Sequence, residues 1–419
     1  MKRRIHVGDL TIGMRVVELD REWLDSPFLF QGFTVSSLDE LSQVRQLCEY
    51  VFVDEEEKSA ATVSRPAASR SSRPSAVVTH QRIEREATQR RPKQTSLEQE
   101  LDTARGVYKQ AVEQTREVFH DARTGRMFDA GGARETVRGI VSSALRNSSA
   151  LLWYAQLQSR EGYTVLHAIN AAVYAAALGS HLGYPEETLI ELSIGALLHD
   201  IGKLKLPAEL LQKAGPLTPA ERALMQKHTT YGFRLLEHTP DLPRSALLVA
   251  LQHHENCDGG GYPKGCLADR THSFSRLVAV IDRYVGLTSD RPQREGMSPQ
   301  AAVKTLYEMR GTALDAQFVD AFIQLLGVYP VGSVVELSSG EVGIVIGSNA
   351  AQRLRPKVLI ILNERKEKAL PLRIVDLQQI RTFGLDEPYD IRRALDPHSY
   401  GMDLNPYIKG YRSRALSVV

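Results

Sequence analysis

The chain has 419 residues, with 52 Lys or Arg against 50 Asp or Glu and a formal net charge of +2. This length allows two or three domains, each with its own core, and excludes a small disulfide-stabilised scaffold. The near-neutral balance gives no electrostatic reason to expect a nucleic-acid polymer or a membrane surface as partner. Three cysteines without CxxC spacing, no signal peptide and no long apolar segment favour a cytoplasmic protein.

The first predicted elements form a small domain over residues 1–56. Apolar and polar residues alternate there in short runs such as RVVELD and YVFVDEE, which is the period of strands. We expect a β-rich accessory domain with one helix near residues 37–48. Residues 57–96 are rich in Ser, Arg and Pro, with nine Lys or Arg against three Glu, and this composition predicts a flexible basic linker.

Helical periodicity begins after the linker. Apolar residues spaced for one helix face predict a helical connector over residues 97–160, with helices at 99–128 and 134–158. These helices could pair between two chains in a homodimer or within one chain as a hairpin. The pattern does not separate the two arrangements.

A run of amphipathic helices with few β-rich stretches is predicted over residues 161–327. One helix start is clear in LTPAE, where Thr218 is the N-cap, Pro219 the first helical residue and Glu221 the third. Together they form a capping box. We expect this helix to continue through Glu237.

The pattern changes to a period of two after the helical domain. The runs SVVELSSGEVGIVIG and KVLIILN predict a small β appendage over residues 328–376, and a mixed polar tail follows over 377–419. The predicted fold class is therefore multidomain and mainly α. An all-helical domain is flanked by a small β-rich N-terminal domain and a small β C-terminal appendage.

Histidines cluster in the helical domain, since eight of the twelve fall between His167 and His272. Imidazole nitrogens and carboxylate oxygens together suit iron, manganese or zinc. Asp200 can bridge two cations through its two oxygens, so the pattern predicts a centre with two metal ions. The candidate ligands come from several helices and are His167, His199, Asp200, His228, His253, His254 and Asp282.

The adjacent pair His253 and His254 bears on how the metals are shared. Neighbouring residues on a regular helix diverge by about 100°, so we expect these rings to serve two different ions, or one ion and its surroundings. Two cations joined by a bridging hydroxide perform phosphodiester hydrolysis. Lys203, four residues after His199, is placed to bind a phosphate oxygen. The predicted catalytic residues are therefore Asp200 and Lys203.

Five motifs resemble, in order and spacing, the HD-GYP branch of the HD-domain phosphohydrolases. They are YTVLHAINAAVYAAALG, LLHDIGKLKLP, LLQKAGPLTPAERALMQKH, HHENCDGGGYPKG and VAVIDRYVGLTSDRP, within residues 155–327. The resemblance implies an HD-type helical domain that hydrolyses the bacterial second messenger cyclic di-GMP to linear pGpG, and often onward to GMP. The stretch GMRVVELDREWLDSPFLFQGF also looks like a domain of unknown role that often precedes HD-GYP modules.

The same resemblance assigns roles to residues. It makes the seven candidates ligands of two divalent ions, iron or manganese, and makes Lys203 the cation that contacts phosphate. The signature loop DGGGYP corresponds to residues 258–263. Some family members carry a glutamate for a third metal where this chain has Tyr163, so we expect two metals. The residues implied to bind substrate are Lys203, Gly261, Tyr262, Pro263, Arg291 and Arg294.

The expected partner is cyclic di-GMP as substrate, with protein partners through the N-terminal domain or the signature loop, and a homodimer. Two other functions stay open at this point. The domain could bind cyclic di-GMP without useful turnover and act as a sensor, or it could hydrolyse another cyclic dinucleotide. Turnover by the metal-loaded protein, with several cyclic dinucleotides compared, separates the three.

Overall fold

The computed structural model describes much of the chain in two compact units, one within residues 1–74 and the other within residues 75–419. Arg291, Arg294 and the predicted linker up to residue 93 lie outside the described residues. The described ranges are 2–20, 33–35, 38–54, 94–124, 130–156, 163–290, 295–347, 354–379, 390–396, 399–401, 406–407 and 417–418.

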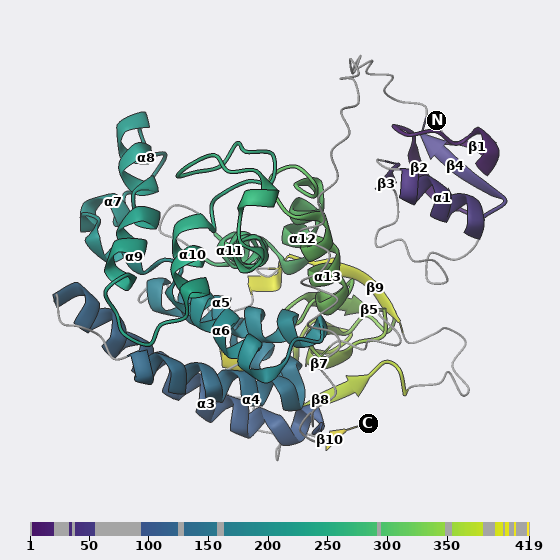
Figure 1. The fold of residues 1–419 in the computed structure, drawn as a ribbon. Helices are drawn as coiled ribbons and strands as arrows, with labels where there is room; N and C mark the ends of the chain where they lie inside the picture. Colours follow the sequence, from purple (N-terminus) through teal and green to yellow (C-terminus); the bar gives the residue numbers. More distant parts are fainter. Residues whose placement is uncertain are drawn as a thin grey trace, which may run out of the picture. The chain divides into compact units, whose positions relative to one another are not determined.

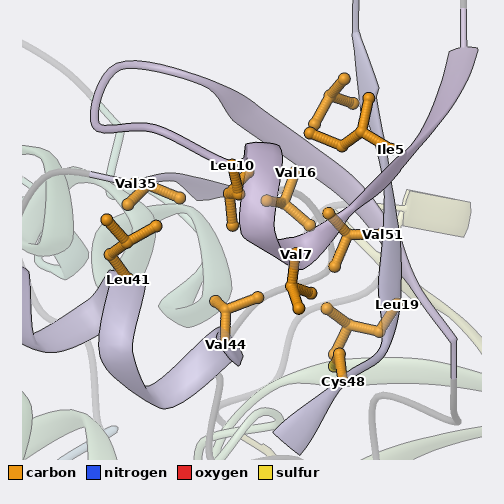
Figure 2. Close-up of a cluster of buried hydrophobic side chains, with 11 residues drawn as sticks. Ile5, Val7, Leu10, Val16, Leu19, Val35, Leu41, Val44, Cys48 and Val51 are labelled. Atoms are coloured by element: carbon orange, nitrogen blue, oxygen red, sulfur yellow. The ribbon is translucent and has the colours of Figure 1, made fainter. Parts of the chain in front are cut away.

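The N-terminal unit is a four-stranded antiparallel sheet with one helix, α1 (Leu38–Leu47). Figure 2 shows its core, where Leu10, Val16, Val44 and Val51 are fully buried. In β4 the alternate residues Val51 and Val53 reach this core, as the period of two requires. The strand order is β1-β4-β2-β3, with β1 (Lys2–His6), β2 (Arg15–Leu19), β3 (Phe33–Thr34) and β4 (Tyr50–Asp54).

The second unit begins with two long helices, α3 (Leu97–Thr124) and α4 (Ala130–Tyr154), which lie side by side (Figure 1). They therefore pack within one chain as a hairpin. The carboxylate of Glu100 on α3 is buried and accepts two hydrogen bonds of 2.8 Å from the guanidinium of Arg146 on α4. Ser143 donates a further hydrogen bond of 2.8 Å to the same carboxylate.

The helical body follows, and its most buried elements are α5 and α6. Every residue of α5 from His167 to Gly179 is buried, because this stretch is rich in alanine and lets neighbouring helices approach closely. The helices are α5 (Tyr163–His181), α6 (Glu186–Leu198), α7 (Ala208–Gln212), α8 (Pro219–Gln226), α9 (His228–Leu236), α10 (Arg244–Gln252), α11 (Ser273–Thr288), α12 (Pro299–Glu308) and α13 (Ala316–Leu326).

The helix predicted from Thr218 through Glu237 is in fact two helices. Its start is as expected, because Thr218 and Glu221 form the capping box. The helix ends at Gln226, however, and α9 begins at His228. The physical reason is burial: α8 has no buried residue, whereas α9 must carry His228 into the interior. The prediction of one continuous helix was wrong.

The C-terminal part is a six-stranded sheet in the order β10-β8-β7-β6-β5-β9. Two of its strands come from the segment that the sequence pattern set apart as a polar tail. The multidomain, mainly α fold class is confirmed. Among the described residues, no helix is both long and apolar enough to cross a membrane. The strands are β5 (Val334–Leu337), β6 (Val342–Gly347), β7 (Lys357–Leu362), β8 (Lys368–Asp376), β9 (Ile391–Leu395) and β10 (Ser417–Val418).

Candidate metal centre

The structure brings all seven predicted ligand residues together, and they come from different elements of the helical body. Most of them stand at helix ends. His199 follows the last residue of α6, His228 opens α9, and His253 follows α10. The other two elements are α5, which carries His167, and α11, which carries Asp282.

The ligand atoms form two groups that share Asp200, and within each group they lie within 4.8 Å of one another. The two oxygens of this carboxylate face different groups. Oδ2 lies 3.4 Å from Nε2 of His199, whereas Oδ1 lies 3.3 Å from Nε2 of His228. We call them the His167 group (His167, His199, Asp200 and Asp282) and the His228 group (Asp200, His228, His253 and His254).

The residues fit divalent metal ions. Nε2 of His199 and Oδ1 of Asp200 are buried and have no hydrogen-bond partner among the described residues. Such unpartnered polar atoms cost free energy in a protein interior, so these two atoms are suited to bind a cation. Imidazole nitrogens with carboxylate oxygens are a donor set that divalent transition metals prefer.

Burial and charge in the centre set the protonation of these side chains. Burial alone raises the pKa of Asp200, but Lys203 and His199 hold it well below its usual range. Burial lowers the pKa of His228 to about 3, so this imidazole is neutral. At His199 burial acts in the same direction, but Asp200 and Asp282 outweigh it and raise the pKa to about 10. A cation bound at His199 would therefore replace a proton.

His253 and His254 both belong to the His228 group, and the expectation that they serve two ions, or one ion and its surroundings, stays a prediction. Helix α10 ends at Gln252, so the two histidines lie in the turn that follows it rather than on a regular helix. Their ring centroids are 4.2 Å apart. The 100° divergence of helical neighbours does not apply there.

Lys203 lies on the short 3-10 helix that follows Asp200, and its ammonium contacts Oδ2 of that residue. It thus touches the carboxylate that both groups share. Packing keeps this segment close to α9: a Cβ on Gly202 would meet the backbone oxygen of His228. Glycine is required where two backbones approach so closely.

The signature loop folds over the His228 group. The ring of Tyr262 lies against that of His254, with centroids 4.7 Å apart and planes tilted by 31°. A Cβ on Gly261 would meet the backbone of Asn256 and His254, so only glycine fits. Pro263 follows Tyr262 through a cis peptide bond.

Sequence reasoning missed Glu255. Its side chain is 4% exposed and accepts hydrogen bonds of 2.8 Å from the backbone N–H groups of Lys264 and Cys266. It therefore ties the two ends of the loop together. The signal was a carboxylate directly after two predicted ligands, but its backbone partners lie nine and eleven residues further on and leave no local pattern.

Family models match three parts of the chain. An HD domain covers residues 148–318, and a domain of unknown function, DUF3391, covers residues 2–133. A KOW domain associated with the HD domain covers residues 334–399.

Curated relatives match either nearly the whole chain or about two fifths of it. A cyclic di-GMP phosphodiesterase of Pseudomonas aeruginosa is 32% identical over 383 residues, which is 90% of this chain and 89% of that protein. A cyclic di-GMP phosphodiesterase of Thermotoga maritima is 36% identical over 40% of this chain and 45% of its own length. A 3'3'-cGAMP-specific phosphodiesterase of Vibrio cholerae is 31% identical over 42% of this chain and 38% of its own length. With an HD domain and a match of this extent, the chain belongs to the HD-GYP family of HD-domain phosphodiesterases.

Proposed function

We propose that this protein hydrolyses cyclic di-GMP to linear pGpG, and onward to GMP, at the two groups that share Asp200. The observation that carries the proposal is the position of that carboxylate, whose two oxygens face different sets of imidazoles. Cyclic di-GMP as substrate is supported by the Pseudomonas relative, which matches nearly the whole chain.

The seven predicted ligands would hold two divalent ions, for which we propose iron or manganese. The His167 group offers two imidazoles and two carboxylates, and the His228 group offers three imidazoles and the shared Asp200. Mixed nitrogen and oxygen donors suit both metals. When bound, two such ions activate water for attack on phosphorus and stabilise the charge of an in-line displacement.

Lys203 would contact the substrate phosphate. Its ammonium carries three donors, and the contact with Asp200 uses one of them. The remaining donors can bind a nonbridging phosphate oxygen, where negative charge grows during the displacement. We assign Asp200 and Lys203 as the catalytic residues, since one holds both cations and the other offsets this charge.

The signature loop and two arginines complete the proposed substrate site. Tyr262 lies beside His254 and offers an aromatic face to a guanine base. Gly261 and Pro263 flank it, and the backbone N–H of Tyr262 donates to the carbonyl of His254 at 3.1 Å. Arg291 and Arg294, which lie outside the described residues, would supply guanidinium groups for the phosphates.

A second candidate substrate is a mixed cyclic dinucleotide. The match to a 3'3'-cGAMP-specific phosphodiesterase supports it, although that match covers 42% of the chain against 90% for the Pseudomonas relative. The two substrates share the phosphodiester linkage and differ in one base. Their comparison therefore tests the base contacts and leaves the metal chemistry unchanged.

The test is anaerobic purification with metal analysis, followed by turnover of cyclic di-GMP and 3'3'-cGAMP with chromatography of the products. We expect two iron or manganese ions per chain and formation of pGpG and GMP. His199→Ala combined with Asp200→Ala should lose both metal and turnover. His238→Ala, an exposed histidine outside both groups, is the matched control and should retain them.

Each other outcome has a distinct meaning. If the protein holds two metals but hydrolyses 3'3'-cGAMP faster than cyclic di-GMP, 3'3'-cGAMP would replace cyclic di-GMP as the proposed substrate. Two metals with binding but no turnover would make the protein a cyclic di-GMP sensor. A native protein without metal would refute the centre itself.

The partners and the compartment belong to the same proposal. We assign the protein to the cytoplasm, where the nucleotide substrate is found, with protein partners at the N-terminal domain or the signature loop. A homodimer would use surfaces other than those joining α3 and α4, which pack on each other within the chain. Light scattering of the full chain tests its oligomeric state.

A further inference from the structure

Three histidines of the centre have backbone partners for Nδ1. These carbonyls lie near the ends of α6, α8 and α10. A carbonyl only accepts, so Nδ1 carries a proton and Nε2 is the nitrogen left to bind a cation. The contacts are His199 to Ala196 O at 2.7 Å, His228 to Met225 O at 2.7 Å and His253 to Val249 O at 3.0 Å.

His167 differs from these three because its Nδ1 contacts a side chain and not a carbonyl. It is the fifth residue of α5, which continues to His181. Nδ1 of His167 lies 3.3 Å from the hydroxyl of Tyr163, one turn earlier. The two rings stack with centroids 5.4 Å apart and planes 23° apart.

A hydroxyl is a different kind of partner from a carbonyl, because it can donate or accept. Nε2 of His167 lies 3.0 Å from Oδ1 of Asp282, a contact that suits a proton on Nε2. In that tautomer the hydroxyl of Tyr163 donates to Nδ1. A cation on Nε2 requires the proton on Nδ1, and the same hydroxyl then turns to accept it.

We infer that Tyr163 is a positioning residue for the metal centre: its hydroxyl accepts the Nδ1–H of His167 when Nε2 binds a cation. It fixes the tautomer and, through ring stacking, the orientation of that imidazole. This inference rests on the proposed metal centre. It concerns the His167 group, because His228 and His253 in the other group have their own carbonyl partners.

The decisive variant is Tyr163→Phe, which keeps the stacked ring and removes the hydroxyl. We would titrate Mn²⁺ into the metal-free full-length protein and follow binding by calorimetry and by electron paramagnetic resonance. Loss of a hydrogen bond to a ligating histidine weakens metal binding about 10–100-fold. We expect the affinity of one of the two binding steps to fall by that factor and the affinity of the other to stay unchanged. The resonance signal of coupled Mn²⁺ pairs should then appear at a higher metal concentration.

The matched control is Tyr329→Phe, which removes a hydroxyl from a partly buried tyrosine packed on the core of the C-terminal sheet. Both binding steps should be native in this variant. Thermal unfolding of the metal-free proteins checks that Tyr163→Phe folds normally. If metal-free Tyr163→Phe unfolds at a lower temperature than the native protein and both metal-binding steps weaken equally, Tyr163 has a general structural role. That result would overturn the inference.

The remaining outcomes separate this inference from the proposed function. Two native binding steps in Tyr163→Phe would overturn the role of the hydroxyl and leave the metal centre intact. Absence of metal binding by the native protein would refute both. Turnover is not needed for either conclusion.

Discussion

Glu255 allows a quantitative test of how the signature loop is held. Its carboxylate accepts two hydrogen bonds of 2.8 Å, from the backbone N–H groups of Lys264 and Cys266. Hydrogen bonds to a charged group contribute about 1.5–3 kcal/mol each. In Glu255→Gln the amide keeps one acceptor oxygen and turns a donor toward the other N–H. One of the two bonds is therefore lost, and the loop should be destabilised by about 1.5–3 kcal/mol.

Hydrogen–deuterium exchange of the loop measures this effect directly. Because about 1.4 kcal/mol corresponds to a factor of ten, protection of the amides of residues 264 and 266 should fall about 10- to 100-fold. Glu209→Gln, which changes an exposed glutamate on α7, is the matched control and should leave the loop unchanged. Native protection in Glu255→Gln would refute the reasoning that this carboxylate holds the loop.

Three further predictions concern the hairpin, the close approach at Gly202 and the metals. Glu100→Ala leaves the guanidinium of Arg146 partly buried without its carboxylate. In urea denaturation we expect a loss of about 2–4 kcal/mol, which overlaps the lower part of the range of about 3–5 kcal/mol for fully buried pairs. Glu113→Ala on the exposed face of α3 should cost little. Gly202→Ala places a Cβ against the backbone oxygen of His228; we expect a loss of metal from the His228 group by metal analysis, and full metal content would contradict the packing argument. Removal of metal by a chelator should lower the thermal unfolding temperature, because a metal concentration of about 100 times Kd stabilises the folded protein by about 2.7 kcal/mol. Re-addition of metal should restore the temperature. An unchanged temperature would count against the metal centre.

The sequence by itself determined the identity of the residues that meet in the centre. The pairs His199–Asp200 and His253–His254, with Asp282 after an apolar run, were recognisable from spacing alone. Local signals also determined the helix start at Thr218 and the presence of strands after the helical domain, although every residue of β5 and β6 is buried. Such features depend on neighbours along the chain, so they are readable without the fold.

Tertiary structure alone decided how those residues are grouped and held. One helix ends before His228 and another begins there, and His253 and His254 lie in one group. Glu255 contacts the loop, and Tyr163 contacts His167. The physical reason is that each of these outcomes depends on where a helix ends and on what packs against it. Periodicity shows which face of a helix is buried. Where the helix ends, and which side chains reach its last carbonyls, is fixed only when the helices pack.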